Sequence, residues 1–272
     1  MKHASTKIVM VLALMAPAGA ALAQPDYGAA PTVNRPGHRE FSWDGGKSLS
    51  VGGAMSVRVR KDGAPRVVVT GPNELVERVY LRRGHLGFEN NTSWWGGGFN
   101  WNDRRVEVEI TGVAPTEVSV SGSSQVTLAD TVRERDFEIH ISGSGSVNAG
   151  GQVEQLDVHV SGSGNARLAA LQARRGDLSV SGSGRVDVEA VEQAEVGISG
   201  SGQVRIKDRP RALSQSISGS GQLTAGGQTY SRRTRELERQ REREMARAER
   251  ERERELAREE RERERERARR DR

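Results

Sequence analysis

Strict alternation of apolar and polar residues runs through the middle of the chain and predicts a succession of short β-strands. The alternation is clearest at residues 157–160 (DVHV) and 185–188 (RVDV). A period of two places apolar side chains on one face of a strand and polar side chains on the other. Residues 49–51, 55–59 and 66–69 show a similar pattern, and we expect these strands to continue the sheet and to cover one of its ends.

A six-residue motif rich in glycine and serine recurs six times between the predicted strands. Its copies are SGSSQV at 121, SGSGSV at 142, SGSGNA at 161, SGSGRV at 181, SGSGQV at 199 and SGSGQL at 218. Neighbouring copies start 18 to 21 residues apart, and alternating residues flank them. The repeated unit is therefore a strand, a tight corner, a second strand and a short return, with glycine supplying the backbone freedom of the corner.

Aligning the copies on their corners groups aliphatic residues into columns. One column before the corner holds Val120, Ile141, Val160, Val180, Ile198 and Ile217, and one after it holds Val126, Val147, Ala166, Val186, Val204 and Leu223. Such columns fill the interior of a β-solenoid, in which successive coils lie about 4.8 Å apart. The sequence thus predicts an all-β fold, a parallel β-helix (β-solenoid) with coils of about 18–21 residues, rather than a β-sandwich, which would not require coils of nearly equal length. Gln215 interrupts a further column in the last copy, as expected of a terminal coil.

The composition changes outside the repeat region and divides the chain into four parts. Residues 1–23 combine two lysines with an apolar run and an A-x-A ending, which predicts a signal peptide, with a retained membrane anchor as the alternative. Residues 24–37 contain three prolines and are expected to form a linker, residues 38–228 the repeat domain, and residues 229–272 a charged tail. We therefore expect a periplasmic or secreted protein that has no transmembrane anchor once the signal peptide is cleaved.

The excess of positive charge is confined to the two ends of the chain. Residues 232–272 hold 18 Arg and 14 acidic residues, and the leader holds two Lys. Residues 24–231 hold 22 basic and 23 acidic residues, so the main domain is not expected to bind nucleic acid. Arg and Glu alternate in the tail, which suits a partly helical rod or a disordered arm. The absence of Cys excludes disulfides, thiolate metal sites and a cysteine nucleophile, and no cofactor is expected.

The order of these motifs resembles that of a known family. The segments LVERVYLRRGHLGFENN, from residue 75, and VEVEITGVAPTEVSVSGSSQV, from residue 106, precede the serial SGSG coils. This succession, over about residues 40–228, is similar to the head GIN domain family (DUF2807), whose members are described as auto-transporter adhesins. The resemblance implies a right-handed parallel β-helix with GSG at the tight turn between two sheets, and a role in adhesion or in the cell envelope.

Five carboxylates share one outward-facing column of the predicted solenoid. Four residues before the corner serine lie Glu117, Glu138, Asp157, Asp177 and Glu195. These charges repel one another at the spacing of the coils, so something should offset them: a bound cation such as calcium, or arginines of the return loops such as Arg135, Arg174 and Arg175. The column is a candidate metal site, but the Gly-Gly-x-Gly-x-Asp nonapeptide of calcium-binding β-helices is absent, and a solvated face with arginine neighbours is favoured.

Two histidines occupy another outward column of the same strands. His140 and His159 stand at equivalent positions of neighbouring copies, and imidazoles this close could bind a transition metal. The column otherwise offers serines, so an exposed ladder is the favoured interpretation. No Ser/His/Asp constellation is identifiable, so the residues of the acidic column are the only candidates for catalysis.

A Trp-rich insert between the predicted strands is the candidate ligand-binding segment. It contains Trp94, Trp95, Phe99 and Trp101 among glycines. Large rings on a flexible backbone suit the binding of a sugar or of a protein. The same rings could instead cover an end of the solenoid, and both interpretations stay open.

These observations favour an exported, non-enzymatic cell-envelope protein, an adhesin-like binding scaffold with a glycan or protein partner. A carbohydrate-active β-helix enzyme that uses the outward carboxylates is one alternative, and a purely structural spacer is another. A groove with converging acids and Arg or Lys would favour the enzyme, whereas evenly spaced, solvated acids would favour the binding scaffold.

Overall fold

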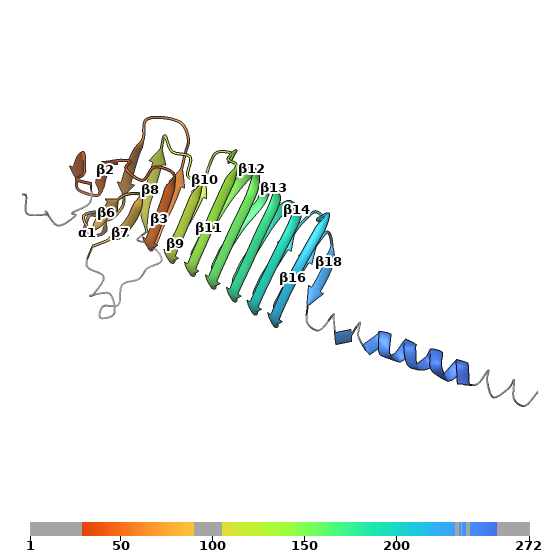
Figure 1. Ribbon diagram of the computed structural model, residues 1–272. Coiled ribbons are helices and arrows are strands. Elements are labelled where there is room, and N and C mark those ends of the chain that lie inside the picture. The colour runs from red at the N-terminus through yellow and green to blue at the C-terminus, as the bar shows by residue number, and fades with distance from the viewer. Residues whose placement is uncertain (1–28, 90–104, 232–233, 235, 238–239, 255–272) are drawn as a thin grey trace, which may run out of the picture.

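The chain winds into a parallel β-solenoid, in which 18 strands of the described part of the chain form one continuous hydrogen-bonded sheet that is folded into two faces (Figure 1). The computed structural model describes residues 29–89, 105–231, 234, 236–237 and 240–254. Its elements are β1 (Val33–Arg35), β2 (His38–Ser42), β3 (Ser48–Gly53), β4 (Met55–Val59), β5 (Arg66–Thr70), α1 (Asn73–Val76), β6 (Val79–Arg82), β7 (His85–Phe88), β8 (Val106–Thr111), β9 (Glu117–Gly122), β10 (Gln125–Leu128), β11 (Asp136–Gly143), β12 (Ser146–Gly162), β13 (Asn165–Gly182), β14 (Arg185–Gly200), β15 (Gln203–Ile206), β16 (Ala212–Gly219), β17 (Gln222–Ala225) and β18 (Gln228–Ser231).

Each coil has one sharp corner at the SGSG motif and one rounded return arc on the opposite side. We call the strands that lead into the corners the pre-corner sheet, which consists of β3, β9, β11, the second halves of β12, β13 and β14, and β16. The strands that follow the corners form the post-corner sheet. β12, β13 and β14 each run from one corner, through a return arc, to the next corner.

The coils stack in the register that the motif alignment predicts. Corner glycines pair from coil to coil, as Gly143 with Gly122, Gly162 with Gly143, and Gly182 with Gly162. The aliphatic columns point inward, and Val120, Val160 and Val180 are each 2% exposed. The predicted all-β fold, a parallel β-helix, is thus confirmed.

The two glycines of a corner are required for different reasons. Gly182 has a φ of 109°, and a Cβ there would lie 2.6 Å from the carbonyl oxygen of Gly162 in the preceding coil. Gly184 faces inward, where a Cβ would lie 2.5 Å from a methyl group of Val160. The first glycine therefore permits the turn and the close approach of two backbones, and the second makes room for the core.

The N-terminal strands form an additional coil and cover that end of the solenoid. β3 pairs with β9 and β4 pairs with β10, both in parallel, so Gly53 stacks on Gly122. After β4, the strands β5 and β6 leave the stack, with β5 antiparallel to both β2 and β8. β7 and β8 then rejoin the stack, in parallel with β3 and β4, and extend it by one further strand on each side. The expectation that the early strands continue the sheet and cover one end is confirmed.

Two boundaries differ from the sequence interpretation. Part of the expected linker, residues 33–35, forms β1, which pairs antiparallel with β2 across Pro36 and Gly37. Gly37 has a φ of 69°, which fits the tight turn between the two strands. At the other end β18 pairs antiparallel with β17, so the ordered domain extends to residue 231 before the tail begins.

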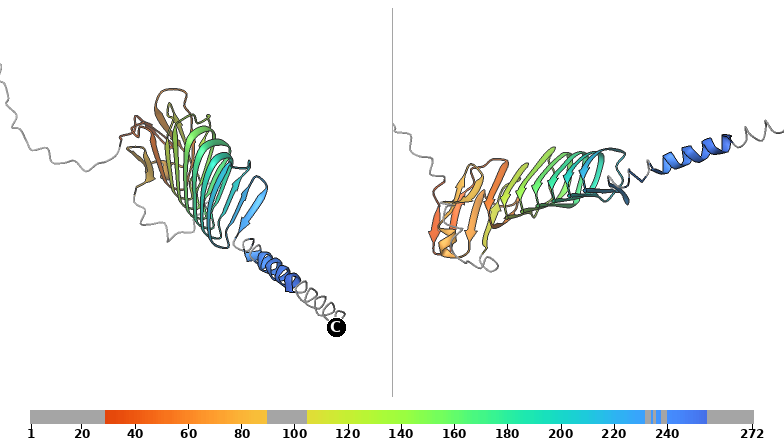
Figure 2. Two further views of the ribbon diagram at one scale, coloured as in Figure 1. Left: turned by 45° about the vertical axis from the view of Figure 1, so that its right-hand side comes forward. Right: turned by 90° about the horizontal axis from the view of Figure 1, so that it is seen from below.

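The last coil is only partly covered. β16 pairs with β14 on one side, and its inward residues Leu213, Gln215 and Ile217 are half-buried. The position of Gln215 in a terminal coil is as expected. Beyond β18, residues 240–254 of the tail are helical, and the helix leads away from the last coil (Figures 1 and 2).

Candidate functional site

The five predicted carboxylates form a continuous column on the pre-corner sheet. Strand register pairs Glu117 with Glu138, Glu138 with Asp157, Asp157 with Asp177, and Asp177 with Glu195. All five side chains are half-buried or exposed. The column is therefore a row of solvated charges, one on each coil.

Each contact of these carboxylates is made along its own strand. Glu138 Oε1 lies 2.6 Å from Nε2 of His140, and Asp157 accepts a hydrogen bond of 3.0 Å from Nε2 of Gln155. Asp177 accepts one of 3.3 Å from the hydroxyl of Ser179. Within the described part of the chain, no group of three or more His, Asp and Glu residues is arranged to hold a metal ion.

The two histidines are brought together as the alignment predicts. His140 and His159 pair in register, and their rings stack with centroids 5.1 Å apart and planes 12° from parallel. Ser119 and Ser179 continue this column on the neighbouring coils. Together with the acidic column and the serines at the ends of the strands, the histidine column makes the pre-corner sheet a polar surface of repeating composition.

The serines of the motif line the edge of this sheet. The serine that precedes each corner glycine stacks on its equivalent in the next coil and is exposed: Ser121, Ser142, Ser161, Ser181, Ser199 and Ser218. We call this row, together with the acidic column, the acid–serine face. Each hydroxyl is about 4.8 Å from the hydroxyl of the next coil, and each carboxylate is about 4.8 Å from the carboxylate of the next coil.

The return arcs carry a second set of charges that the sequence interpretation did not recognise. Five charged residues follow one another on successive coils: Arg135, Glu154, Arg174, Glu192 and Arg211. The first four lie three residues before members of the acidic column, and Arg211 lies three residues before Ser214, which pairs with Glu195. The sequence signal for this set is the alternation of Arg and Glu at a fixed distance before the acidic column. Arg135 Nε lies 3.6 Å from Glu154 Oε2, so this arginine forms an ion pair with a glutamate of the next return arc rather than with a carboxylate of the acidic column.

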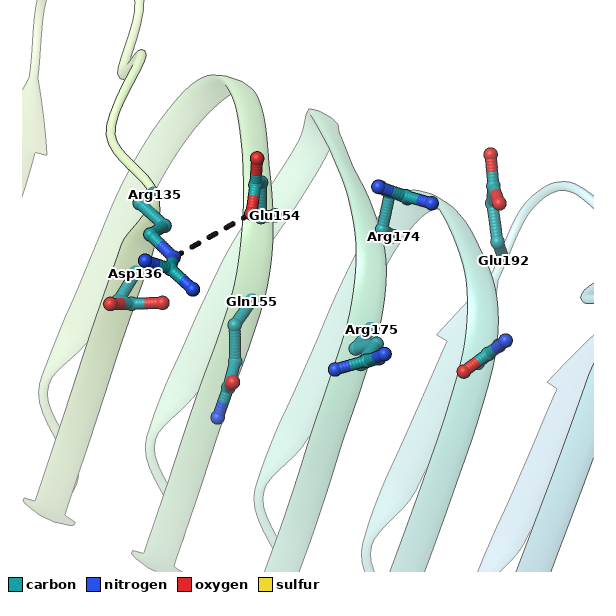
Figure 3. Close-up of a pocket in the computed structure, with 8 residues that line it drawn as sticks. Arg135, Asp136, Glu154, Gln155, Arg174, Arg175 and Glu192 are labelled. Carbon is teal, nitrogen blue, oxygen red and sulfur yellow. Dashed lines mark ion pairs between the residues drawn. The ribbon is translucent and has the colours of Figure 1, made fainter.

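The arcs enclose an open hollow of about 290 Å³ (Figure 3). It is lined by Arg135, Asp136, Glu154, Gln155, Arg174, Arg175, Glu192 and Gln193. These side chains belong to different coils and do not converge on one point (Figure 3). A second hollow, of about 510 Å³, lies between Arg175 and the acidic residues Asp157, Asp177 and Glu195. The acids that line it lie one on each successive coil.

The candidate ligand-binding residues Trp94, Trp95, Phe99 and Trp101 lie outside the described residues. The strands on either side are described: β7 pairs with β3, and β8 pairs with β4. The insert is therefore joined to the coil at the N-terminal end of the solenoid. In the described ranges, no helix is both long and apolar enough to span a bilayer.

Solved structures of other proteins share the fold of this solenoid. The chain has a TM-score of 0.54 and 17% identity to the crystal structure of a putative adhesin from Bacteroides fragilis, with 69% of this chain and 95% of that chain covered. A putative adhesin from Parabacteroides merdae gives a TM-score of 0.43 at 15% identity, and a putative lipid binding protein from Parabacteroides distasonis gives 0.40 at 20%, with the same coverage. No curated protein matches the sequence.

The family profile covers the coils described above. Residues 47–229 match the family described as "putative auto-transporter adhesin, head GIN domain". The matched range begins beside β3 and ends within β18, so it includes every corner of the solenoid. The resemblance seen in the motif order is confirmed, and this chain belongs to the head GIN domain family.

Proposed function

We propose that this protein is an exported, non-enzymatic binding scaffold of the cell envelope, which contacts a glycan or protein partner through the acid–serine face. The observation that carries the proposal is the register of that face. Each of the six coils that carry the motif presents a hydroxyl at the edge of the sheet, and five of them in succession add a carboxylate. The family description as an adhesin supports the same function.

A repeating surface suits an extended partner. A ligand that makes one weak contact per coil gains affinity because each further contact forms at high effective concentration. Hydroxyls donate and accept hydrogen bonds, and carboxylates accept them, so the face matches sugar hydroxyls or the amide and basic groups of a protein. The hydrogen-bonded coils hold these groups at fixed spacing, which lowers the entropic cost of binding.

The post-corner sheet has a different character and provides an internal comparison. Arg205 lies 4.0 Å from Asp187, and Lys207 lies 2.6 Å from Glu189, so opposite charges pair across its coils. Arg185 also donates to the amide oxygen of Gln203 at 2.8 Å. These three pairs join opposite charges or a donor and an acceptor from coil to coil, whereas neighbouring members of the acidic column carry charges of one sign.

The signal-peptide sequence and the family support a periplasmic or secreted location. Fractionation of cells that produce the full chain would test export: the protein should be recovered outside the cytoplasm and shortened to begin near Gln24. Recovery of uncleaved protein in the cytoplasm would contradict this part of the proposal.

Binding to purified envelope fractions tests the assigned face. Ser161→Arg combined with Ser181→Arg places two large side chains on adjacent coils of the acid–serine face. Gln203→Arg combined with Gln222→Arg makes the matched change on the post-corner sheet. We expect the serine pair to weaken binding at least about tenfold and the glutamine pair to leave it unchanged. Equal effects of the two pairs would exclude the face, and digestion of the fractions with glycosidase or protease identifies the class of partner.

The Trp insert is tested separately by Trp94→Ala combined with Trp95→Ala. Loss of binding without loss of thermal stability would assign the contact to the insert. A large fall in melting temperature with unchanged binding would show that the rings cover the solenoid instead.

A further inference from the structure

We propose that the tail helix of one chain docks along the return arcs of a second copy, so that two chains form a closed, two-fold symmetric dimer. Two sets of charges carry the inference. The first is the arc ladder, which consists of Arg135, Glu154, Arg174, Glu192 and Arg211. The second is the tail stripe, which consists of Glu244, Arg247, Glu251 and Arg254.

The arc ladder alternates in sign along the solenoid axis. Gln155 pairs with Arg175 and Arg175 with Gln193, which places the residues just before them in register. Backbone hydrogen bonds from Glu154 N–H to Arg135 O, and from Arg211 N–H to Glu192 O, extend the row at both ends. All members are exposed, and the ion pairs among described residues involve Arg135 and Glu154 but leave Arg174, Glu192 and Arg211 available.

The tail stripe also alternates in sign, on one side of a helix. Its members are separated by three, four and three residues, the spacing that places side chains on a common face. Arg247 Nε lies 3.5 Å from Glu251 Oε1, as expected for neighbours on that face. Every described residue from 240 to 254 is exposed, so the stripe is not covered by its own solenoid.

The two sets have matching length. The stripe spans ten residues of helix, or about 15 Å. Arg211, Glu192, Arg174 and Glu154 span three coil steps, or about 14 Å. A helix that enters at the C-terminal coil therefore places Glu244 opposite Arg211 and Arg247 opposite Glu192. The same placement sets Glu251 opposite Arg174 and Arg254 opposite Glu154.

The direction of the tail identifies the occupant as a second copy. The helix leads away from the last coil rather than back along its own arcs (Figures 1 and 2). In the proposed dimer, the C-terminal coils of the two copies face each other. The tail helix of the first copy then lies along the return arcs of the second copy, and the tail helix of the second copy lies along the return arcs of the first. Each tail fills the site of the other chain, which closes the assembly as a dimer.

The mass of the purified protein in solution, measured by analytical ultracentrifugation over a range of concentrations and salt, tests the proposal. We expect a dimer at low salt that dissociates at high salt, because the contacts are exposed ion pairs. Arg174→Glu places three carboxylates in succession and should weaken dimerisation about tenfold, as should Glu251→Arg in the tail. The two changes combined recreate an opposite-charge pair and should restore the dimer.

Two controls keep the result specific. Arg167→Glu makes the same change of charge on an exposed residue of the post-corner sheet and should leave the dimer intact. A chain that ends at residue 239 should be monomeric with an unchanged circular-dichroism signal for the sheets. A monomer under all conditions, a dimer that survives truncation, or a combined variant no better than either single variant would each overturn the proposal.

Discussion

The hydroxyl of Ser124 joins two coils whose sequences lie far apart: it accepts a hydrogen bond of 3.1 Å from the backbone N–H of Met55. The same hydroxyl donates to the carbonyl oxygen of Gly53 at 3.0 Å. Ser124 is fully buried and occupies the position that is glycine in the other five copies of the motif. Ser124 therefore provides hydrogen-bond partners for the backbone N–H of Met55 and the carbonyl oxygen of Gly53, where the additional N-terminal coil meets the regular stack.

Ser124→Ala is expected to destabilise the protein by about 1–3 kcal/mol, because the N–H of Met55 loses its partner in a buried position. Ser124→Gly, which restores the SGSG sequence of the other copies, should destabilise it as well. The midpoint of urea unfolding measures both effects. Ser123→Ala, at an exposed corner position, is the control and should change stability by less than about 0.5 kcal/mol. A Ser124→Gly variant as stable as the parent would show that the hydrogen bonds contribute nothing.

Gly182→Ala should cost about 1–3 kcal/mol from its positive φ alone, and more from the approach of the new Cβ to the Gly162 carbonyl oxygen. The expected readout is a lower melting temperature with a smaller cooperative transition. Ser183→Ala, at the exposed position beside it, should leave the melting temperature nearly unchanged. Equal melting temperatures for the two variants would contradict the role assigned to the corner glycine.

Lys207 should titrate differently when its partner is removed. Its ammonium donates to Glu189 Oε1 at 2.6 Å, and this hydrogen bond, followed by the charge of Glu189, raises the pKa of Lys207 above 10.5. Because the pKa is raised on folding, the stabilisation is complete below pH 10.5 and is lost only as the pH rises through the raised pKa. Glu189→Gln should lower the pKa measured by NMR titration of the Nζ, while Glu107→Gln should not. An unchanged pKa would exclude the pair in solution.

Asp177→Asn should stabilise the protein slightly at low salt. The substitution removes one charge from the acidic column, where like charges on adjacent strands each cost a few tenths of a kcal/mol, up to about 1 kcal/mol. The gain in melting temperature should shrink as salt screens the column. Asp136→Asn, on β11 but outside the column, is the control and should show no such gain. A loss of stability that does not depend on salt would contradict repulsion within the column.

The sequence could predict the regular coils because their information is local and repeated. Every copy of the motif repeats a corner glycine with a positive φ and aliphatic residues at the inward positions. Alignment of the copies is therefore sufficient to predict the register of the acidic column and the pairing of His140 with His159. The corner at Gly53 was missed because its sequence, VGGAM, lacks the serines of the other copies. Its pairing with Gly122 depends on contacts between distant residues, which periodicity does not report.

The arc ladder was missed for a different reason. The sequence predicts Arg135, Arg174 and Arg175 as neighbours of the acidic column, but the return loops lack the strict alternation that would place Glu154 and Glu192 in the same row as these arginines. The structure shows that the arcs hold one position of each coil in line, so that outward charges are ordered even where the backbone is rounded.

The departure of the chain between the first and second coils has a consequence for the order of folding. From Glu117 onward each coil contacts coils that are adjacent in sequence, so this part can form by addition of one coil to the next with little loop closure. The N-terminal coil instead joins Gly53 to Gly122 only after the chain between them has closed a long loop. We therefore expect the regular coils to form first and the N-terminal end to complete the molecule last.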